Sequence, residues 1–181
     1  MQPPGKRVFL IGYRGAGKTT VAGILAGHLG WGWLDADAML EQQCGRNIRT
    51  IFSEDGEPAF RDKESAILEQ LCAAEHKVIA TGGGVVLKAE NRQRLRCAGR
   101  VVWLAADAGT LWRRLQNDPL TAEQRPALSS GGLAEIELML QVREPFYREC
   151  ADLVVLTAGR SPREVALEIL AQLNSETNDR S

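Results

Sequence analysis

The chain has 181 residues, of which 44% are hydrophobic and 25% are charged. This length and composition are typical of one globular domain, here residues 1–181, and they exclude a fibrous or largely disordered protein. Its 22 lysines and arginines nearly balance 23 acidic residues, so no general positive charge favours nucleic acid or an anionic membrane surface. An anionic ligand would therefore have to be held by local groups.

The cysteines and the two chain ends indicate where the protein works. The four cysteines are scattered without a Cys-x-x-Cys pair, which favours reduced thiols over a zinc site or a disulfide framework. The apolar run at 8–11 is too short for a signal peptide or a membrane span. The polar segment 174–181 lacks apolar periodicity and predicts a disordered tail. We expect a cytoplasmic protein.

Short apolar runs alternate with longer segments of helical periodicity, as in folds whose parallel strands are joined by crossover helices. The predicted strands are 8–11, 33–35, 78–81, 101–104 and 153–156. The predicted helices are about 18–29, 57–74, 89–97, 108–116, 133–150 and 162–173. The sequence thus predicts an α/β fold with a five-stranded parallel sheet and helices on both faces. Ligands of such sheets bind at the carboxyl ends of the strands.

The first predicted strand leads into Gly12-Tyr-Arg-Gly-Ala-Gly-Lys18-Thr19, which fits the phosphate-loop motif G-x-x-x-x-G-K-[ST]. Its glycines allow backbone amides to turn inward into an anion-binding nest, and the following helix adds its positive N-terminus. Lys18 can then reach the terminal phosphates, and the Thr19 hydroxyl can bind Mg²⁺. The alternative is a glycine-rich turn that happens to contain a lysine, but the flanking strand and helix favour a nucleotide site.

Two carboxylates, Asp35 and Asp37, come at the end of the second predicted strand. On an extended backbone, residues two apart point the same way, so both can serve one site. One can hold a water molecule on Mg²⁺ while the other orients or deprotonates an acceptor hydroxyl. The alternative is that Asp37 caps a helical segment at 38–44.

Two arginines and a glycine triplet predict the acceptor side of the site. Arg61 lies in an early helical turn with Glu64 on the same face, and Arg143 lies near the end of a later helix. The planar guanidinium suits a carboxylate, although a solvated helix face is the commoner place for an arginine. Glycines 82–84 follow the third strand and allow the main chain to approach a ligand closely, or simply to turn.

Residues 117–132 form the one long connection rich in Pro, Gly and Ser, and a loop of this length is typically a functional lid or disordered. Arg125 lies in its middle. On a closing lid it can neutralise charge on the transferring phosphoryl group while the loop excludes water. The alternative is a surface arginine in a disordered loop.

These motifs together resemble the shikimate kinase family from about residue 7 to residue 170, in the family's order and at similar spacings. The match includes the phosphate loop, Asp35-Ala-Asp37, Phe60-Arg61-Asp-Lys-Glu64, the glycine triplet, Arg125-Pro126, and Arg143 with Tyr147. The resemblance implies a three-layer α/β/α P-loop kinase fold like that of nucleoside monophosphate kinases, with strand order 2-3-1-4-5. It also implies transfer of the ATP γ-phosphoryl group to the 3-hydroxyl of shikimate, a step of chorismate biosynthesis.

The resemblance assigns a role to each residue in turn. Lys18, Asp37 and Arg125 are the expected catalytic residues, and Thr19 and Asp35 the expected Mg²⁺ site. The acceptor is expected to contact Asp37, Arg61, Gly82, Gly83, Gly84 and Arg143, with the main chain of Gly83 foremost. The expected ATP-binding residues are Gly12, Gly15, Ala16, Gly17, Lys18, Thr19, Thr20, Arg114, Arg125, Arg160 and Pro162.

Three points remain open in the sequence. Many relatives carry an aspartate after the last strand where this chain has Thr157-Ala-Gly-Arg160, which leaves the adenine contacts unsettled. A kinase of gluconate or of a nucleoside monophosphate would share the phosphate loop. A non-catalytic ATP-binding sensor would not need Asp37 or Arg125, whose presence favours an enzyme. We expect a monomer that binds ATP and shikimate.

Overall fold

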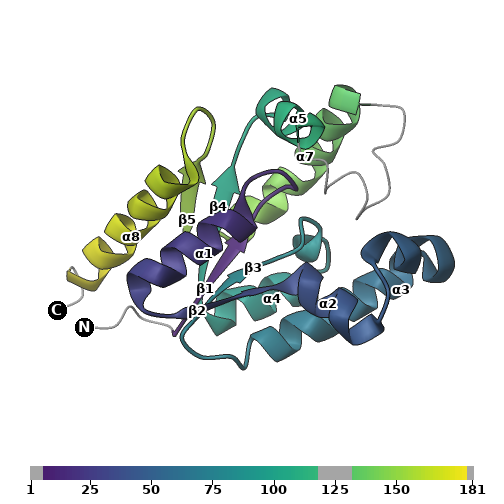
Figure 1. Ribbon diagram of the computed structural model, residues 1–181, viewed down its shortest axis with the longest axis horizontal. Helices are drawn as coiled ribbons and strands as arrows, with labels where there is room; N and C mark the ends of the chain where they lie inside the picture. Colours follow the sequence, from purple (N-terminus) through teal and green to yellow (C-terminus); the bar gives the residue numbers. More distant parts are fainter. Residues whose placement is uncertain (1–5, 118–131, 179–181) are drawn as a thin grey trace.

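The computed structural model describes residues 6–117 and 132–178. Five parallel strands form one sheet in the order β2-β3-β1-β4-β5 (Figure 1). The strands are β1 (Arg7–Ile11), β2 (Gly32–Asp35), β3 (Lys77–Ala80), β4 (Arg100–Ala105) and β5 (Leu153–Leu156). The predicted parallel sheet and its strand order are confirmed.

Helices cover both faces of the sheet. They are α1 (Lys18–Leu29), α2 (Ala36–Cys44), α3 (Ile48–Leu71), η1 (Val85–Leu87), α4 (Ala89–Ala98), α5 (Ala108–Gln116), α7 (Gly132–Cys150) and α8 (Pro162–Asn178). Successive strand residues point to opposite faces. Val8 and Leu10 therefore pack into a core with α1 and α8, whereas Phe9 and Ile11 pack into a second core with α3 and the end of α7. The three-layer arrangement is confirmed.

Two predicted boundaries are wrong. The helix expected from 57 begins at Ile48, because the Asn47 side chain caps it by accepting a hydrogen bond from the Thr50 amide at 2.8 Å. Gly56, with φ of 83°, bends the backbone inside α3 and hides its continuity in the sequence. At the other end α8 continues to Asn178, five residues beyond the helix end predicted at residue 173. Near this end of α8 the Ser175 hydroxyl donates to the Gln172 carbonyl at 2.9 Å.

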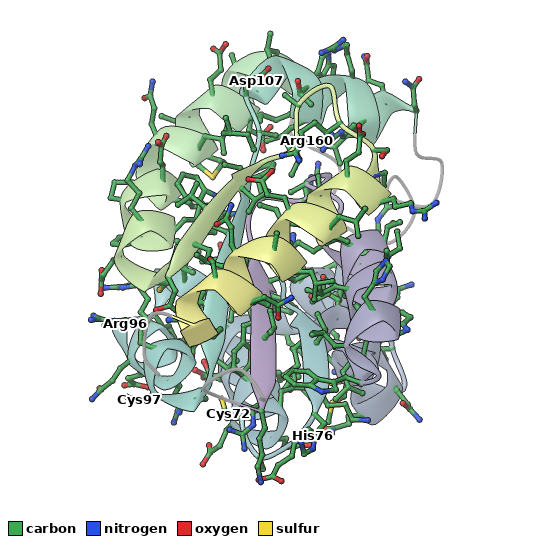
Figure 2. The ribbon with its side chains drawn as sticks, turned by 90° about the vertical axis from the view of Figure 1, so that its left-hand side faces the viewer. Cys72, His76, Arg96, Cys97, Asp107 and Arg160 are labelled. Atoms are coloured by element: carbon green, nitrogen blue, oxygen red, sulfur yellow. The ribbon has the colours of Figure 1, made fainter. Side chains whose placement is uncertain are left out.

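The loops at the carboxyl ends of the strands gather along one edge of the sheet. Figure 2 shows Asp107 and Arg160, which follow β4 and β5, at one end of the molecule. His76 and Arg96, which precede β3 and β4, lie at the opposite end. The phosphate loop follows β1 and so belongs to the first end. No helix of the described residues is both long and apolar enough to cross a bilayer.

Candidate active site

The phosphate loop curls around the N-terminus of α1. Gly12 has φ of 138°, and a Cβ added there would lie 2.5 Å from the Leu104 carbonyl oxygen, so a side chain would both strain the backbone and overlap β4. Gly15 and Gly17 also have positive φ, at 80° and 91°. This geometry turns backbone amides inward at a helix N-terminus, which is the arrangement that binds phosphate.

The side chains that follow the loop lie at its rim. Lys18 Nζ donates to the carbonyls of Gly12 and Tyr13 at 2.8 and 3.0 Å, so the ammonium group folds back over the loop. The Thr19 hydroxyl donates to Asp35 Oδ2 at 2.6 Å. These are hard oxygen donors of the kind that Mg²⁺ prefers. Within the described residues no three His, Cys, Asp or Glu side chains cluster to hold a metal, so an ion here would take its other ligands from phosphate and water.

The two carboxylates after β2 have different local roles. Asp35 Oδ1 accepts hydrogen bonds from the amides of Asp37 and Ala38 at 2.9 and 3.1 Å, which makes Asp35 the N-cap of α2. The alternative in which Asp37 caps this helix is therefore wrong, as is the placement of both residues on one extended strand. The cap holds the Asp35 carboxylate next to Thr19, while Asp37 stands in the first turn of α2.

A cavity of about 430 Å³ joins the ends of the first three strands. Its lining includes Arg14, Lys18 and Thr19 from the phosphate-loop side, Asp35 and Asp37 after β2, and Thr81 after β3. A phosphoryl donor and a small acceptor can thus meet in one space. The predicted convergence of these loops is present in the structure.

Arg61 projects from α3 toward the glycine triplet that follows β3, and it is not part of the lining of the cavity of about 430 Å³. Its guanidinium donates to Glu64 Oε2 at 2.7 Å and to Glu57 Oε1 at 3.1 and 3.2 Å. The rings of Phe52 and Phe60 lie beside it, with centroids 6.0 and 5.1 Å from Cζ. The Arg61 side chain is only 13% exposed, so ion pairs and ring contacts together fix the guanidinium in place.

Glu64 is a buried carboxylate, with only 5% of its side chain exposed. Burial raises the pKa of Glu64 above its usual range, although the nearby positive charges of Arg61 and Arg143 act in the opposite direction. The predicted role of Glu64 as an anchor for Arg61 agrees with this geometry. Glu57, in contrast, is 58% exposed and binds the solvent side of the same guanidinium.

The glycine triplet after β3 is required for space and not for unusual backbone angles, since none of its members has positive φ. A Cβ on Gly82 would lie 2.6 Å from Glu64 Oε1 and 3.0 Å from Asp37 Oδ1. A Cβ on Gly84 would overlap the guanidinium of Arg61. The missing side chains thus let two carboxylates and an arginine pack directly against this loop.

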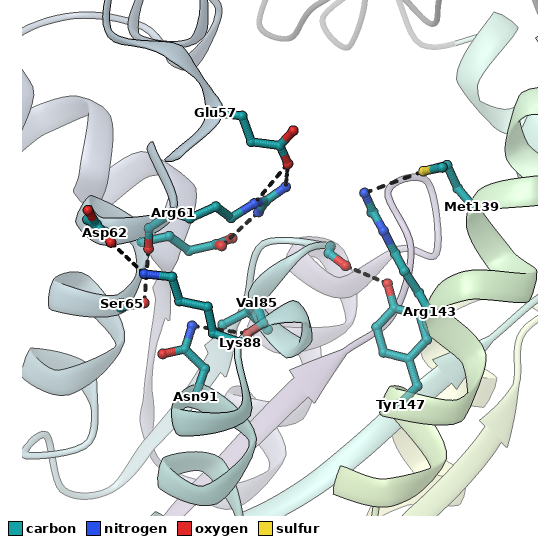
Figure 3. Close-up of polar contacts among 12 residues, drawn as sticks. Glu57, Arg61, Asp62, Ser65, Val85, Lys88, Asn91, Met139, Arg143 and Tyr147 are labelled. Carbon is teal, nitrogen blue, oxygen red and sulfur yellow. Dashed lines mark hydrogen bonds and ion pairs between the residues drawn. The ribbon is translucent and has the colours of Figure 1, made fainter. Parts of the chain in front are cut away.

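Arg143 and Tyr147 approach the same loop from α7, while Arg61 approaches it from α3 (Figure 3). The fully buried Tyr147 donates its hydroxyl to the Gly83 carbonyl at 2.5 Å, and burial raises its pKa well above the usual 10.0. Arg143 Cζ lies 5.4 Å from the centroid of the Tyr13 ring. Among the described residues, Arg143 Nη2 donates to the Met139 sulfur at 3.9 Å, and the buried Nε of Arg143 has no hydrogen-bond partner.

A second cavity, of about 220 Å³, lies behind the phosphate loop. It is lined by Ala16, Gly17, Val21, Arg114, Thr157, Arg160, Pro162 and Val165. Arg114 donates to the carbonyls of Gly15 and Thr157 at 3.2 and 2.7 Å, which ties the phosphate loop to the loop after β5. The structure therefore brings together the three residues predicted near the adenine, whereas Arg125 lies outside the described residues.

Comparison with known proteins settles the family. Residues 14–174 match the family model described as Shikimate kinase. The shikimate kinase of Pseudomonas syringae pv. syringae (strain B728a) is 44% identical over 169 residues, which cover 93% of this chain and 96% of the relative. The chain belongs to the shikimate kinase family. The family resemblance seen in the sequence is confirmed, and with it the assignment as an ATP-dependent phosphotransferase.

Solved structures agree with the family assignment. A shikimate kinase from Acinetobacter baumannii, determined in complex with shikimate, has a TM-score of 0.90 and 34% sequence identity, with 96% of each chain covered. A gluconokinase from Sinorhizobium meliloti 1021 has a TM-score of 0.60 at 20% identity and shares the fold alone. The predicted P-loop kinase fold is thus confirmed.

Sequence reasoning missed several side chains that the structure places at this shikimate kinase site. Arg14 occupies a position that the phosphate-loop motif leaves open, and Tyr13 contacts Arg143 only through the tertiary fold. The ion pair between Glu57 and Arg61 has a recognisable signal, because residues four apart share a helix face. Phe52 lay outside the predicted helix, so its contact with Arg61 was not anticipated.

Proposed function

We propose that this chain transfers the γ-phosphoryl group of ATP to the 3-hydroxyl of shikimate and releases shikimate 3-phosphate and ADP. The observation that carries the proposal is the cavity of about 430 Å³, which has a phosphate loop on one side and Asp37 on the other. Membership of the shikimate kinase family supports this reaction. The relative from A. baumannii, solved with shikimate, supports the choice of acceptor.

The donor half holds the triphosphate. The amides of the loop from Gly12 to Thr20 and the ammonium of Lys18 bind the β- and γ-phosphates. Thr19 and Asp35 would hold Mg²⁺, and the ion would neutralise phosphate charge. Gly15, Ala16 and Gly17 shape the loop against the nucleotide. Arg114, Arg160 and Pro162 surround the base in the cavity of about 220 Å³.

The acceptor half holds and activates the hydroxyl. Asp37, whose Oδ1 lies against Gly82, accepts the hydroxyl proton as the oxygen attacks the γ-phosphorus and the bond to ADP breaks. Arg61 and Arg143 bind the acceptor carboxylate from α3 and α7. The buried Nε of Arg143, which has no hydrogen-bond partner within the described residues, supports an anionic ligand at this point. The main chain of the triplet, mainly Gly83, contacts the acceptor.

The remaining assignments belong to the same proposal. Arg125, on the segment 117–132, closes over the phosphates and excludes water that would otherwise hydrolyse ATP. The protein acts as a cytoplasmic monomer on two small-molecule substrates, without nucleic acid or membrane partners. The near-neutral net charge, −1 at pH 7, supports the absence of nucleic-acid and membrane partners.

The test is a coupled assay of ADP release with shikimate, gluconate, quinate and CMP as acceptors. We expect turnover with shikimate alone, and comparable turnover on another acceptor would overturn the specificity.

Asp37→Asn should lower kcat by about 100-fold or more, the usual scale for loss of a general base, while ADP affinity stays unchanged. Asp62→Asn is the matched control, because Asp62 lies on α3 with a side chain 76% exposed and pairs only with Lys88 among the described residues. Wild-type turnover no higher than that of the Asp37 variant would instead favour a non-catalytic sensor.

A further inference from the structure

Arg14 stands at the junction of the two halves of the site. Its side chain lines the cavity of about 430 Å³ together with Lys18 and Asp37. A Cβ added to Gly83 would lie 3.3 Å from the Arg14 amide nitrogen, so the phosphate loop packs here against the main chain of the glycine triplet. The backbone of the phosphate loop and the backbone of the glycine triplet therefore fix the position of the Arg14 main chain.

Groups of both charges lie around Arg14. Burial lowers the pKa of Arg14, and the positive charge of Arg143 acts in the same direction, while Tyr13 and Glu135 act in the opposite direction. A guanidinium nevertheless stays protonated near neutral pH. Glu135 offsets part of the repulsion between Arg14 and Arg143, and a negative group bound in the cavity that Arg14 lines would offset more of it.

We propose that Arg14 is a further catalytic residue, whose guanidinium contacts the transferring phosphoryl group and neutralises the charge that develops on its oxygens. The proposal rests on the proposed function. The bond between the γ-phosphorus and ADP breaks while the bond to the acceptor oxygen forms, and the acceptor proton passes to Asp37. Arg14 donates hydrogen bonds throughout and neither gains nor loses a proton.

The position of Arg14 on the chain distinguishes this role from binding of the acceptor carboxylate. Arg61 and Arg143, the residues proposed to hold that carboxylate, project from α3 and α7. Arg14 belongs instead to the loop whose amides face the phosphates, four residues before Lys18. Its placement relative to Lys18 is set by the loop itself, so this arginine needs no lid closure to reach the phosphoryl group.

The experiment compares Arg14→Met and Arg14→Lys with the wild type. We expect kcat to fall about 10-fold or more in Arg14→Met, with partial recovery in Arg14→Lys; an arginine that supplies most of the charge stabilisation would cost about 1,000-fold or more. The affinity for ADP with aluminium fluoride, which mimics the transferring group, should fall by a similar factor, about 10-fold, because that affinity follows transition-state stabilisation. The affinity for ADP alone should stay within about twofold, which also shows that the variant is folded.

Arg96→Met is the matched control. Arg96 is an exposed arginine in the last turn of α4 and lies at the end of the sheet opposite the phosphate loop (Figure 2). This variant should keep the wild-type kcat and the wild-type affinity for ADP with aluminium fluoride.

Two outcomes would overturn the assignment of Arg14. One is an unchanged kcat with unchanged aluminium-fluoride affinity. The other is a raised KM for shikimate with unchanged kcat, which would assign Arg14 to the acceptor carboxylate. Failure of the proposed function can be distinguished from failure of the Arg14 assignment. If the wild type phosphorylates a different acceptor, Arg14→Met should still lower the affinity for ADP with aluminium fluoride.

Discussion

Glu57→Gln is expected to strengthen acceptor binding. Glu57 accepts hydrogen bonds from Nε and Nη2 of Arg61, the same planar edge that would bind an acceptor carboxylate. The incoming carboxylate must therefore displace Glu57, whereas the buried Glu64 can keep its contact with Nη1. Removal of the Glu57 charge should leave Arg61 paired with Glu64. The Nε and Nη2 edge of the Arg61 guanidinium would then be available to the substrate.

The size of the effect follows from the exposure of this ion pair. Glu57 is 58% exposed, and an ion pair of this kind contributes about 0.2–1 kcal/mol. Its loss should lower the KM for shikimate by about 1.5- to 5-fold, because 1.4 kcal/mol corresponds to a factor of about ten. The KM for ATP should not change, since Glu57 is not part of the cavity lining near the phosphate loop.

Initial rates over a range of shikimate concentrations at saturating ATP measure this shift. Glu54→Gln is the matched control, because Glu54 is 59% exposed and also pairs with an arginine, Arg46, at 2.8 Å. The control should leave both KM values unchanged. An unchanged or higher KM for shikimate in Glu57→Gln would refute the idea that Glu57 competes with the substrate.

Two further variants probe Arg61 and its buried partner Glu64. Arg61→Lys keeps the positive charge but loses the planar guanidinium. The KM for shikimate in the coupled assay should therefore rise roughly tenfold, which corresponds to the loss of about one charge-assisted hydrogen bond. The KM for ATP should stay constant, and equal rises in both KM values would contradict the assignment. Glu64→Gln tests the raised pKa of Glu64 by urea unfolding between pH 4 and 8. A carboxyl with a raised pKa in the folded state contributes its full stability below its unfolded pKa of about 4.5 and loses it as the pH rises through the folded value. The stability of the wild type relative to Glu64→Gln should therefore fall with rising pH, and a rise would show that the ion pair with Arg61 outweighs burial.

The donor half of the site could be predicted from the sequence because its determinants are local. The phosphate loop is a contiguous motif whose glycines, at Gly12 above all, are required by their own φ and by the neighbouring β4 carbonyl. The spacing of Arg61 and Glu64 likewise identified an ion pair within one helix. Sequence patterns report such contacts because both partners lie within one or two turns of the chain.

The parts that could not be predicted depend on contacts between distant segments. Nothing local to Arg14 indicates that it meets the main chain of Gly83, which lies on a different strand-end loop. The glycine triplet was expected to allow ligand approach or a turn, and the structure shows that it also makes room for side chains from α2 and α3, which its sequence did not indicate. The helix predicted from residue 57 begins nine residues earlier, because Asn47 caps it and the chain continues past Gly56 with a bend.

The two halves of the site are held by different means, and this difference bears on how substrates bind. The donor half is built from main-chain amides of the phosphate loop at the N-terminus of α1. Glycines with positive φ set the shape of this loop, and Arg114 holds it through a hydrogen bond to the Gly15 carbonyl. Arg114 also donates to the Thr157 carbonyl after β5. The acceptor half is built from side chains, and the charge of Arg61 among them already has partners in Glu57 and Glu64. A triphosphate therefore meets a preformed nest, whereas an acceptor must exchange one ion pair for another. Acceptor affinity is accordingly the property that single substitutions on α3 should change most, in either direction, without altering the nucleotide site.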